Sequence, residues 1–247
     1  MQETSYSDTQ KMQKTRIEWC DFSANPIDGL CLNKCFYCYE AARRHRFHLK
    51  EKIIFHPDFF NKRQANNFSK KYRRPARIFV GSTHEIFGNW ILKEWIEHII
   101  NVVRHNPEHL FIFLSKNPER YASFDFPDNC WLGATVICKK DLWRIDTMRN
   151  IGGFISIEPL LEDISDLSFK GIKWIIIGAM TGRYRKKYQP KIEWIKEILR
   201  IADREKRPVF MKNNLKPYWQ GKLRQEFPIH LQGIKGGKDG WSDLWWK

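Results

Sequence analysis

Short runs of apolar residues, many of them β-branched, recur along this chain and alternate with segments in which apolar residues return every three or four positions. A short, continuous apolar run is typical of a strand that is buried on both faces, as the strands of parallel sheets are. The expected strands are residues 77–81, 110–114, 131–136, 154–157, 174–178 and 208–211, with one more near residues 27–30.

Two of the intervening segments have the apolar periodicity of amphipathic helices that pack on a core. One stripe consists of Ile91, Trp95, Ile99 and Val103, and the other, after Pro190, consists of Ile192, Ile195, Leu199 and Ala202. Alternation of strands and helices implies a parallel sheet with right-handed crossovers. About seven strands in this order predict an α/β fold, an open or partial (β/α) barrel of mostly parallel strands with outer helices.

Polar residues follow the expected strands at their C-terminal ends. They are the loop that begins at Cys31, Ser82 to Glu85, Ser115 to Asn117, Glu158, Thr181, and Lys212 to Asn214. In β/α barrels this end of the strands carries the active site. We therefore expect these groups to meet at one mouth of the barrel.

Three cysteines, Cys31, Cys35 and Cys38, stand in a C-x3-C-x2-C array on a loop that follows Gly29. Three thiolates on so short a tether can ligate three irons of a [4Fe–4S] cluster and leave the fourth iron without a protein ligand. The amino and carboxylate groups of S-adenosylmethionine suit that open iron. Electron transfer from the cluster would cleave the sulfonium and generate an adenosyl radical.

Zinc is the competing metal for these thiols. It prefers a closed tetrahedron of four ligands, usually two separated pairs, so an asymmetric array of three needs a fourth ligand from elsewhere. The nearest candidates are Cys20, His45 and His48. Tyr37, just before the last cysteine, could pack over a cluster or an adenine, or belong to the core.

The chain is strongly basic, with a net charge of +15. Basic residues concentrate in residues 43–46, 70–74, 183–187 and 204–207, with Tyr72 and Tyr184 interleaved. Phosphates attract cations and aromatic rings stack on bases, so this pattern suits RNA or DNA as a partner. A solvated basic surface without such a partner is the alternative.

The number of cysteines and the length of the apolar stretches indicate the cellular compartment in which the protein functions. Six cysteines are too few and too clustered for a disulfide framework in 247 residues. Residues 1–15 are polar and lack the apolar run of a secretory signal, and no apolar stretch reaches the length that crosses a bilayer. We expect a reduced, cytoplasmic setting and no membrane partner.

The length suits one large α/β domain, and no repeat, low-complexity tract or Pro/Gly-rich linker divides the chain. We expect residues 1–15 to be a flexible N-terminal arm and residues 16–216 to form the barrel domain. Residues 217–247 are then a basic, Trp-rich C-terminal extension.

Several segments besides the cysteine array match a known family. The first are Ile17-Glu18-Trp19, Asn25-Pro26-x-x-Gly29 and the array ending in Cys38-Tyr39. Those further along are Arg77-Ile-Phe-Val-Gly-Ser82, Ile86-Phe87-Gly88, Ser115-Lys116-Asn117-Pro118-Glu119-Arg120, Phe126-Pro127-x-Asn129-x-Trp131-Leu132-Gly133, Ser156-Ile157-Glu158-Pro159-Leu160-Leu161, Trp174-Ile-Ile-Ile-Gly178 and Pro208-Val-Phe-x-Lys212-x-Asn214-Leu215. With them the chain resembles the phage-associated radical-SAM-like proteins of unknown function, also called three-cysteine-motif proteins. The resemblance covers nearly all of residues 16–216, and it implies a radical-SAM barrel, a [4Fe–4S] cluster and S-adenosylmethionine.

At two positions the chain departs from the family pattern. It reads Ser82-Thr83-His84-Glu85 where the family usually has an acidic residue after a triplet such as Ser-Met-Gly, so the acid is preserved in kind as Glu85. Cys20 stands where the family commonly has threonine, which argues against Cys20 as an essential ligand.

The resemblance also implies roles for individual residues. The three cysteines of the array bind the cluster. From its position beside Cys38 alone, Tyr37 is a candidate cofactor contact. In radical-SAM enzymes the end of the second strand contacts the cofactor's amino group, and Gly81, Ser82 and Glu85 are the closest match here. The alternative for Glu85 is a carboxylate favoured at a helix N-terminus.

Lys116, Glu158 and Lys212 directly follow apolar strands, so inside a closed barrel each must pair or meet a ligand. We assign all three as candidate catalytic residues. Lys116 could also hold the cofactor carboxylate, and Glu158 could meet ribose hydroxyls or a substrate amine. A structural Glu158–Lys212 bridge is the alternative. His84 is the one histidine in a comparable position.

The leading hypothesis is therefore a radical S-adenosylmethionine enzyme that modifies or repairs a nucleic acid or nucleotide. It would need an electron donor such as a flavodoxin or ferredoxin. The second hypothesis is a non-catalytic nucleic-acid-binding protein of a mobile element, with an Fe–S or zinc centre. A third is a radical enzyme for a small molecule or peptide, whose basic surface is incidental.

Overall fold

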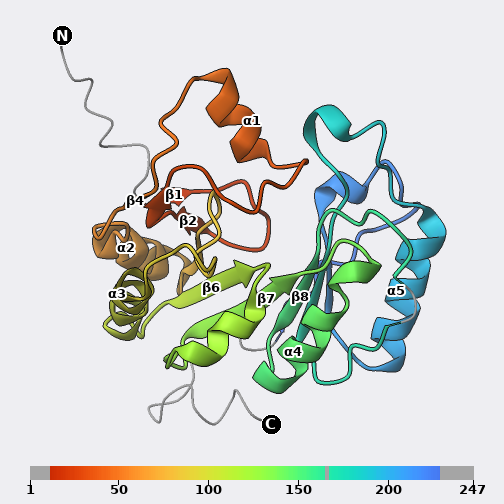
Figure 1. The fold of residues 1–247 in the computed structure, drawn as a ribbon. Helices are drawn as coiled ribbons and strands as arrows, with labels where there is room; N and C mark the ends of the chain where they lie inside the picture. The colour runs from red at the N-terminus through yellow and green to blue at the C-terminus, as the bar shows by residue number, and fades with distance from the viewer. Residues whose placement is uncertain (1–11, 165–166, 229–247) are drawn as a thin grey trace.

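A computed structural model of the protein describes residues 12–164 and 167–228, which surround one eight-stranded sheet (Figure 1). Its strands, in spatial order, are β1 (Gln13–Lys14), β2 (Phe22–Ala24), β5 (Arg77–Val80), β6 (Leu110–Ser115), β7 (Cys130–Thr135), β8 (Phe154–Ile157), β9 (Trp174–Ile177) and β10 (Val209–Met211). β1 runs antiparallel to β2, and every other neighbouring pair is parallel. This confirms the expected mostly parallel sheet and each strand predicted from β5 onward.

The strand predicted near residues 27–30 does not belong to this sheet, so its assignment to the barrel was wrong. It is the short β3 (Ile27–Asp28), which pairs with β4 (Ile54–Phe55) in a separate antiparallel ribbon. The sheet instead uses β2, in which Phe22 pairs with Ile78 of β5 and all three residues are buried. Such a short segment, with a serine at its centre, lacks the apolar run by which the other strands were recognised.

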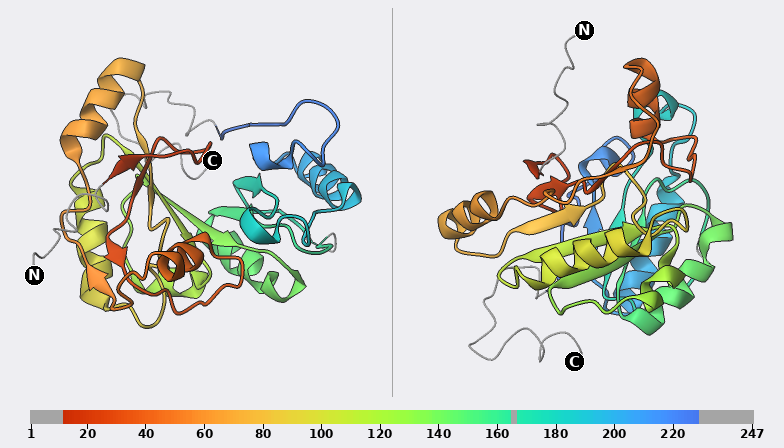
Figure 2. Two further views of the ribbon diagram at one scale, coloured as in Figure 1. Left: turned by 90° about the horizontal axis from the view of Figure 1, so that it is seen from above. Right: turned by 60° about the vertical axis from the view of Figure 1, so that its left-hand side comes forward.

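Most helices pack on the outer face of the sheet, and one lies above the sheet in the view of Figure 1 (Figures 1 and 2). They are α1 (Tyr39–Arg46), α2 (Lys62–Tyr72), α3 (Lys93–Arg104), α4 (Trp143–Ile151) and α5 (Ile192–Arg204), with 3-10 turns η1 (Pro118–Ser123), η2 (Lys139–Asp141), η3 (Gly182–Tyr184) and η4 (Asn213–Leu215). The two predicted amphipathic helices are α3 and α5. Most of each predicted stripe is buried, whereas Trp95 and Ile192 are half-buried. Ile91 is buried but precedes α3, in a turn closed by its amide and the Gly88 carbonyl.

The strands bury both faces because alternate residues belong to two different cores. In β9, Ile175 and Ile177 pack in the large cluster shared with the outer helices, whereas Trp174 and Ile176 pack in a second cluster inside the curved sheet. The inner cluster is rich in aromatic rings, including Trp131 and Phe154, which stack at a centroid distance of 6.0 Å. These rings fill one end of the barrel interior.

A segment after β10 helps to close the barrel. Glu226 donates its amide to the Val209 carbonyl at 3.0 Å, and its own carbonyl accepts the indole N–H of Trp174 at 2.9 Å. Phe227 packs 5.6 Å from the Trp174 ring, and the guanidinium of Arg77 lies 4.3 Å from the Phe227 centroid. The segment runs from β10 toward the N-terminal strands (Figure 2, left).

The sequence placed the boundary of the barrel domain at residue 216. Residues 224–227 nevertheless contact β9, β10 and β5, so this part of the expected extension packs on the barrel. Residues 229–247 and the greater part of the expected arm, residues 1–11, lie outside the described residues.

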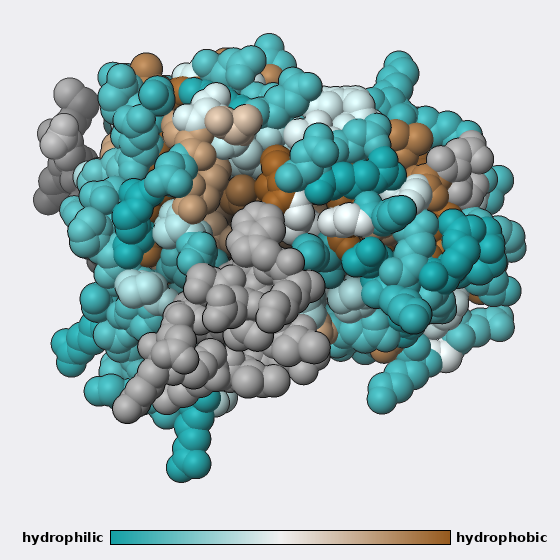
Figure 3. Space-filling model, turned by 90° about the horizontal axis from the view of Figure 1, so that it is seen from below, coloured by the Kyte–Doolittle hydropathy of each residue, from teal (hydrophilic) through white to brown (hydrophobic). Residues whose placement is uncertain are grey.

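None of the helices in the described ranges has both the length and the apolar character needed to cross a bilayer. Seen from below, the described surface is mainly hydrophilic, with small apolar areas near the centre of that face (Figure 3).

Replacement of Phe227 by alanine is expected to lower the free energy of unfolding by about 2 kcal/mol, because a half-buried ring leaves the floor of the barrel. Urea unfolding followed by tryptophan fluorescence measures this change. Phe47→Ala is the matched control, since that ring is 60% exposed and its loss should change stability by less than about 0.5 kcal/mol. Equal effects of the two variants would contradict the packing role of Phe227.

Candidate functional site

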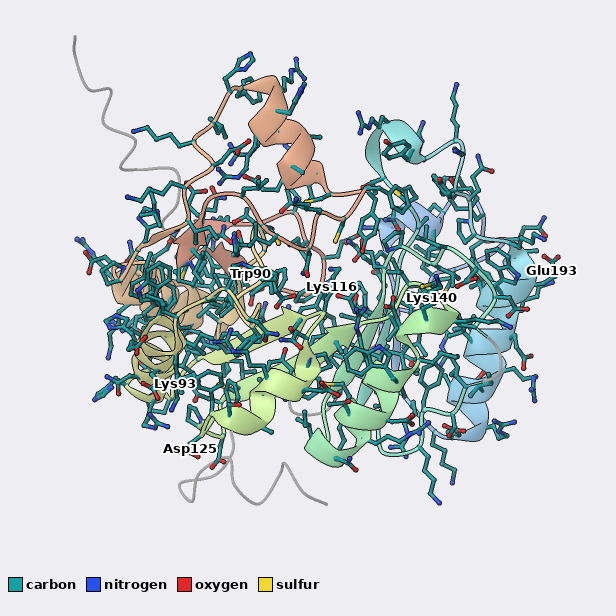
Figure 4. The ribbon with its side chains drawn as sticks, viewed as in Figure 1. Trp90, Lys93, Lys116, Asp125, Lys140 and Glu193 are labelled. Carbon is teal, nitrogen blue, oxygen red and sulfur yellow. The ribbon has the colours of Figure 1, made fainter. Side chains whose placement is uncertain are left out.

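A cavity of about 750 Å³ opens at the C-terminal ends of the parallel strands. Every residue that the sequence assigned to the site lines it: Cys31, Cys35, Tyr37, Cys38, Gly81, Ser82, Glu85, Lys116, Glu158 and Lys212. The expectation that these groups meet at one mouth is therefore confirmed. Figure 4 shows Lys116 among the strand ends, whereas Lys93 lies on the outer helix α3.

The cysteine array forms a tight loop between the β3–β4 ribbon and α1. Backbone hydrogen bonds from Lys34 to Cys31 and from Cys38 to Cys35, at 3.4 and 3.0 Å, fold it into successive turns. Cys38 is the N-cap of α1, and its sulfur accepts the Ala41 amide at 3.4 Å. The last thiol of the array is thus fixed by the start of a helix.

Gly29 sets the entry to this loop. Its φ is +110°, and a Cβ at this position would lie 2.5 Å from the Lys52 carbonyl oxygen. Only glycine fits this combination of positive φ and close backbone approach. Gly29 therefore shapes the turn that leads into the cysteine loop.

Buried charges fix α1 on the other side of the loop. Arg44 is 5% exposed, forms an ion pair with Asp28, and contacts Glu40 one turn earlier at 3.0 Å. Arg44 also donates to the Lys50 carbonyl at 2.8 Å. This network was not predicted from the sequence, although the Glu40–Arg44 spacing of four residues is typical of a helical ion pair.

The residues considered as a fourth zinc ligand do not lie beside the three cysteines of the array. Cys20, His45 and His48 do not line the cavity, and Cys20 is buried in the inner core with its thiol directed at the Ile17 carbonyl. Burial raises the pKa of the Cys20 thiol far above its ordinary value. The fourth ligands considered for zinc are therefore not at the array.

Within the part of the chain that the structure describes, no group of three or more His, Cys, Asp or Glu side chains is arranged as metal ligands. The three thiols of the array nevertheless line one cavity. Burial raises the pKa of the Cys31 thiol, and a bound metal would favour its deprotonated form.

Glu85 connects the cysteine loop to the sheet. Its carboxylate accepts four hydrogen bonds, from the Ser115 hydroxyl (2.7 Å), the Lys116 amide (2.8 Å), the Phe87 amide (3.1 Å) and the Asn33 side-chain amide (3.2 Å). Two carboxylate oxygens offer about four acceptor positions, so these donors occupy most of its capacity. The geometry favours a structural role for Glu85 over direct cofactor binding.

Gly81 and Ser82 turn the chain at the end of β5. Gly81 has a φ of +84°, and a Cβ there would lie 2.5 Å from the Ile86 side chain. The Ser82 hydroxyl donates to buried Asn25 at 3.0 Å, and the Ser82 carbonyl accepts the Tyr39 hydroxyl at 2.9 Å. The strand end is thereby tied both to the residue after β2 and to α1.

Of the three charged candidates, two are paired. Lys212 forms an ion pair with Glu158, and its ammonium also lies 4.0 Å from Glu18. The bridge considered as an alternative therefore exists. The Lys116 ammonium instead lies 6.0 Å from the centroid of the Tyr37 ring.

Tyr37 and His84 are held in low-dielectric surroundings. Burial, with the neighbouring Cys35 thiol, raises the pKa of the Tyr37 phenol well above its usual range. Burial lowers the pKa of His84, whose Nδ1 lies 3.0 Å from the Glu85 carbonyl oxygen. His84 is therefore neutral at pH 7.

Some buried polar groups on the cavity wall have no hydrogen-bond partner among the described residues. They include the indole N–H of Trp19 and the hydroxyl of Ser156, whose residues are 2% and 1% exposed. The sequence analysis gave neither residue a role, although each belongs to a motif that carried the resemblance. Such groups are suited to hydrogen-bond a polar ligand.

Two solved structures share this fold. A complex of spore photoproduct lyase with dinucleoside spore photoproduct superimposes with a TM-score of 0.59 at 10% sequence identity, over 83% of this chain and 79% of that one. A doubly substituted mutant of spore photoproduct lyase, with bound AdoMet and dinucleoside spore photoproduct, gives a TM-score of 0.53 at 11% identity, over 79% of this chain and 65% of that one. These likenesses show the fold, a partial (β/α) barrel of mostly parallel strands with outer helices.

No protein with a curated description matches the chain. A family profile does, over residues 14–225, which include the cysteine array and every strand of the sheet except the first residue of β1. The chain therefore belongs to the family described as protein of unknown function (DUF5131).

Proposed function

We propose that this protein is a radical S-adenosylmethionine enzyme that acts on a nucleic acid or nucleotide. The observation that carries the proposal is the placement of three cysteines, without a fourth cysteine, on a cavity at the strand ends of a radical-SAM-type barrel. A volume of about 750 Å³ lies within the roughly 300–1,000 Å³ of small-molecule sites, which suits a cofactor and part of a substrate.

The three cysteines of the array would hold a [4Fe–4S] cluster. Their chemistry fits it, since three thiolates satisfy three irons and leave one position for the cofactor. When bound, the cluster supplies the electron for reductive cleavage of S-adenosylmethionine.

The protein's own residues would orient these groups. Glu85 fixes the cysteine loop through Asn33 and keeps the Lys116 backbone in place. The Lys116 ammonium, beside the Tyr37 ring, is placed to hold a carboxylate. Glu158 is 24% exposed on its side chain, and it would offer its second oxygen to a ribose hydroxyl while the first stays paired with Lys212.

The basic surface supports a polyanionic partner, because the chain carries a net charge of +15. An electron donor such as a flavodoxin or ferredoxin belongs to the same proposal, as does the phage association implied by the family resemblance. The competing hypothesis of a zinc-containing binding protein lacks the expected fourth ligands, since Cys20, His45 and His48 are absent from the cavity lining.

Anaerobic reconstitution of the full chain is expected to yield about four irons and four sulfides per protein, because the array can hold one cluster. Alanine at Cys31, Cys35 or Cys38 should abolish the brown absorbance. Cys138→Ala is the matched control, since that cysteine lies outside the cavity. With dithionite, the reconstituted protein should then convert S-adenosylmethionine to 5′-deoxyadenosine.

The opposite results are equally clear. One zinc and no iron, or a full cluster in all three array variants, would refute the cluster assignment. A cluster-loaded protein that forms no 5′-deoxyadenosine would refute the proposed reaction class.

Replacement of Glu85 by glutamine should lower the free energy of unfolding by roughly 2–4 kcal/mol, because an amide N–H₂ would face backbone donors and a charged acceptor would be lost. Urea unfolding measures the change. The exposed Glu119→Gln is the control and should behave like the unchanged protein. Equal stability of the Glu85 variant would contradict its structural role.

Glu158→Gln is expected to cause only a small loss of stability without cofactor, since Glu18 remains 4.0 Å from the Lys212 ammonium. Added S-adenosylmethionine should raise the melting temperature of this variant less than that of the unchanged protein, because a ligand that binds more weakly stabilises less at the same concentration. Thermal unfolding with and without cofactor measures both. A large basal loss with a full cofactor shift would assign Glu158 to structure alone.

A further inference from the structure

An aromatic cluster with adjacent cations stands at the rim of the cavity. It consists of Phe36, on the cysteine loop, and of Tyr184 and Tyr188, on the loop that follows β9. The centroid of the Phe36 ring lies 5.6 Å from that of Tyr184 and 5.2 Å from that of Tyr188. We call these three rings the rim platform.

The platform is open to solvent although its residues are apolar or aromatic. Phe36 is 46% exposed, and Tyr184 and Tyr188 are half-buried. A large apolar ring that stays exposed gives up the stabilisation that burial would bring. Its exposure indicates a surface that a partner covers.

Cations surround the rings. The guanidinium of Arg183 lies 4.6 Å from the Tyr184 centroid, and the ammonium of Lys187 lies 5.2 Å from the Tyr188 centroid. The same loop carries Arg185 and Lys186, and residues 179–192 contain no acidic residue. Among the ion pairs of the described ranges, none includes a cation of residues 183–187.

The platform adjoins the chemistry directly. Phe36 lies between Cys35 and Tyr37, which both line the cavity, and Thr181 lines it immediately before the 3-10 turn that carries Tyr184. A ligand that rests on the rings therefore lies at the entrance to the cavity, beside the cysteine loop.

We propose that the rim platform binds an unpaired nucleic-acid strand, with bases stacked on Phe36, Tyr184 and Tyr188 and phosphates held by Arg183, Lys186 and Lys187. Exposed rings interleaved with cations are what unpaired strands require, because stacking is independent of sequence and the backbone is a polyanion. A duplex offers no open base faces and would gain only the charge contribution. The inference deepens the nucleic-acid part of the proposed function and rests on it for the substrate class.

The test measures binding of a labelled oligothymidylate or oligouridylate of about 12 nucleotides by fluorescence anisotropy, within the span of roughly 4–16 nucleotides typical of such sites. The full chain should bind one or both more tightly than a duplex of the same length. The combined Tyr184→Ala and Tyr188→Ala variant should bind about ten-fold or more weakly, with an unchanged salt dependence. The combined Tyr184→Phe and Tyr188→Phe variant should bind like the unchanged protein, because it keeps both aromatic rings.

The cations should act differently from the rings. The triple variant Arg183→Gln, Lys186→Gln and Lys187→Gln should reduce the slope of log affinity against log salt by about 2, since each phosphate contact on a single strand contributes roughly 0.7. The matched control removes as many charges from outer helices: Lys62→Gln, Lys93→Gln and Lys196→Gln. It should leave the slope unchanged.

Cross-linking tests the contact independently of how the variants fold. An oligonucleotide that contains 5-iodouracil, irradiated with the unchanged protein, should cross-link to Phe36 or to peptides of residues 182–188. Cross-links confined to other segments would overturn the proposal. So would full binding by the double alanine variant, equal effects of the charge variant and its control, or duplex binding as tight as strand binding.

These outcomes separate the platform from the enzyme. A protein that binds strands through residues 183–188 but assembles no iron–sulfur cluster would refute the proposed reaction and keep the platform. A protein that cleaves S-adenosylmethionine but shows no strand binding would refute the platform and keep the reaction class.

Discussion

Four hydrogen bonds to one buried carboxylate hold the cavity in shape. Glu85 accepts donors from the end of β6, from the turn after β5 and from the cysteine loop, three segments that are distant in sequence. Removal of any one donor would leave the buried Glu85 carboxylate with an unsatisfied acceptor position, which is costly in a low-dielectric site. The position of the three cysteines relative to the sheet thus depends on Glu85, which lies far from them in the sequence.

The depth of the cavity follows from the way the barrel interior is filled. Trp131, Phe154 and Trp174 occupy the end where the strands begin, and their rings pack against one another inside the sheet. Toward the strand ends the inward residues become small or polar, as with Ser156 and Gly178. At Gly178 a Cβ would lie 3.0 Å from the Glu158 side chain, so a larger residue there would crowd the carboxylate that pairs with Lys212.

The sequence predicted the features that depend on local pattern. Strands buried on both faces produce apolar runs, so β5 to β10 could be recognised, and so could the polar residues that end them. β2 escaped because Ser23 is buried at its centre and interrupts any run. The Asp28–Arg44 pair and three of the four hydrogen bonds to Glu85 join residues that are far apart in the chain, and no local pattern predicts them. The antiparallel pairing of Gln225 with Phe210 is likewise a tertiary contact made by a segment of ordinary polar composition.

Contacts between the N-terminal part of the barrel and the residues around and after β10 form a seam on one side of the barrel. This seam limits when the nascent chain can complete its fold. Asn213 donates its amide to Glu18 at 2.7 Å, and the Arg77 guanidinium lies over the Phe227 ring. Both contacts join an N-terminal part of the described chain to a C-terminal part. During synthesis the cysteine loop leaves the ribosome nearly two hundred residues before Phe227 does. This seam therefore cannot form until the chain has been synthesised through Phe227, and a nascent chain exposes its cysteines before that point.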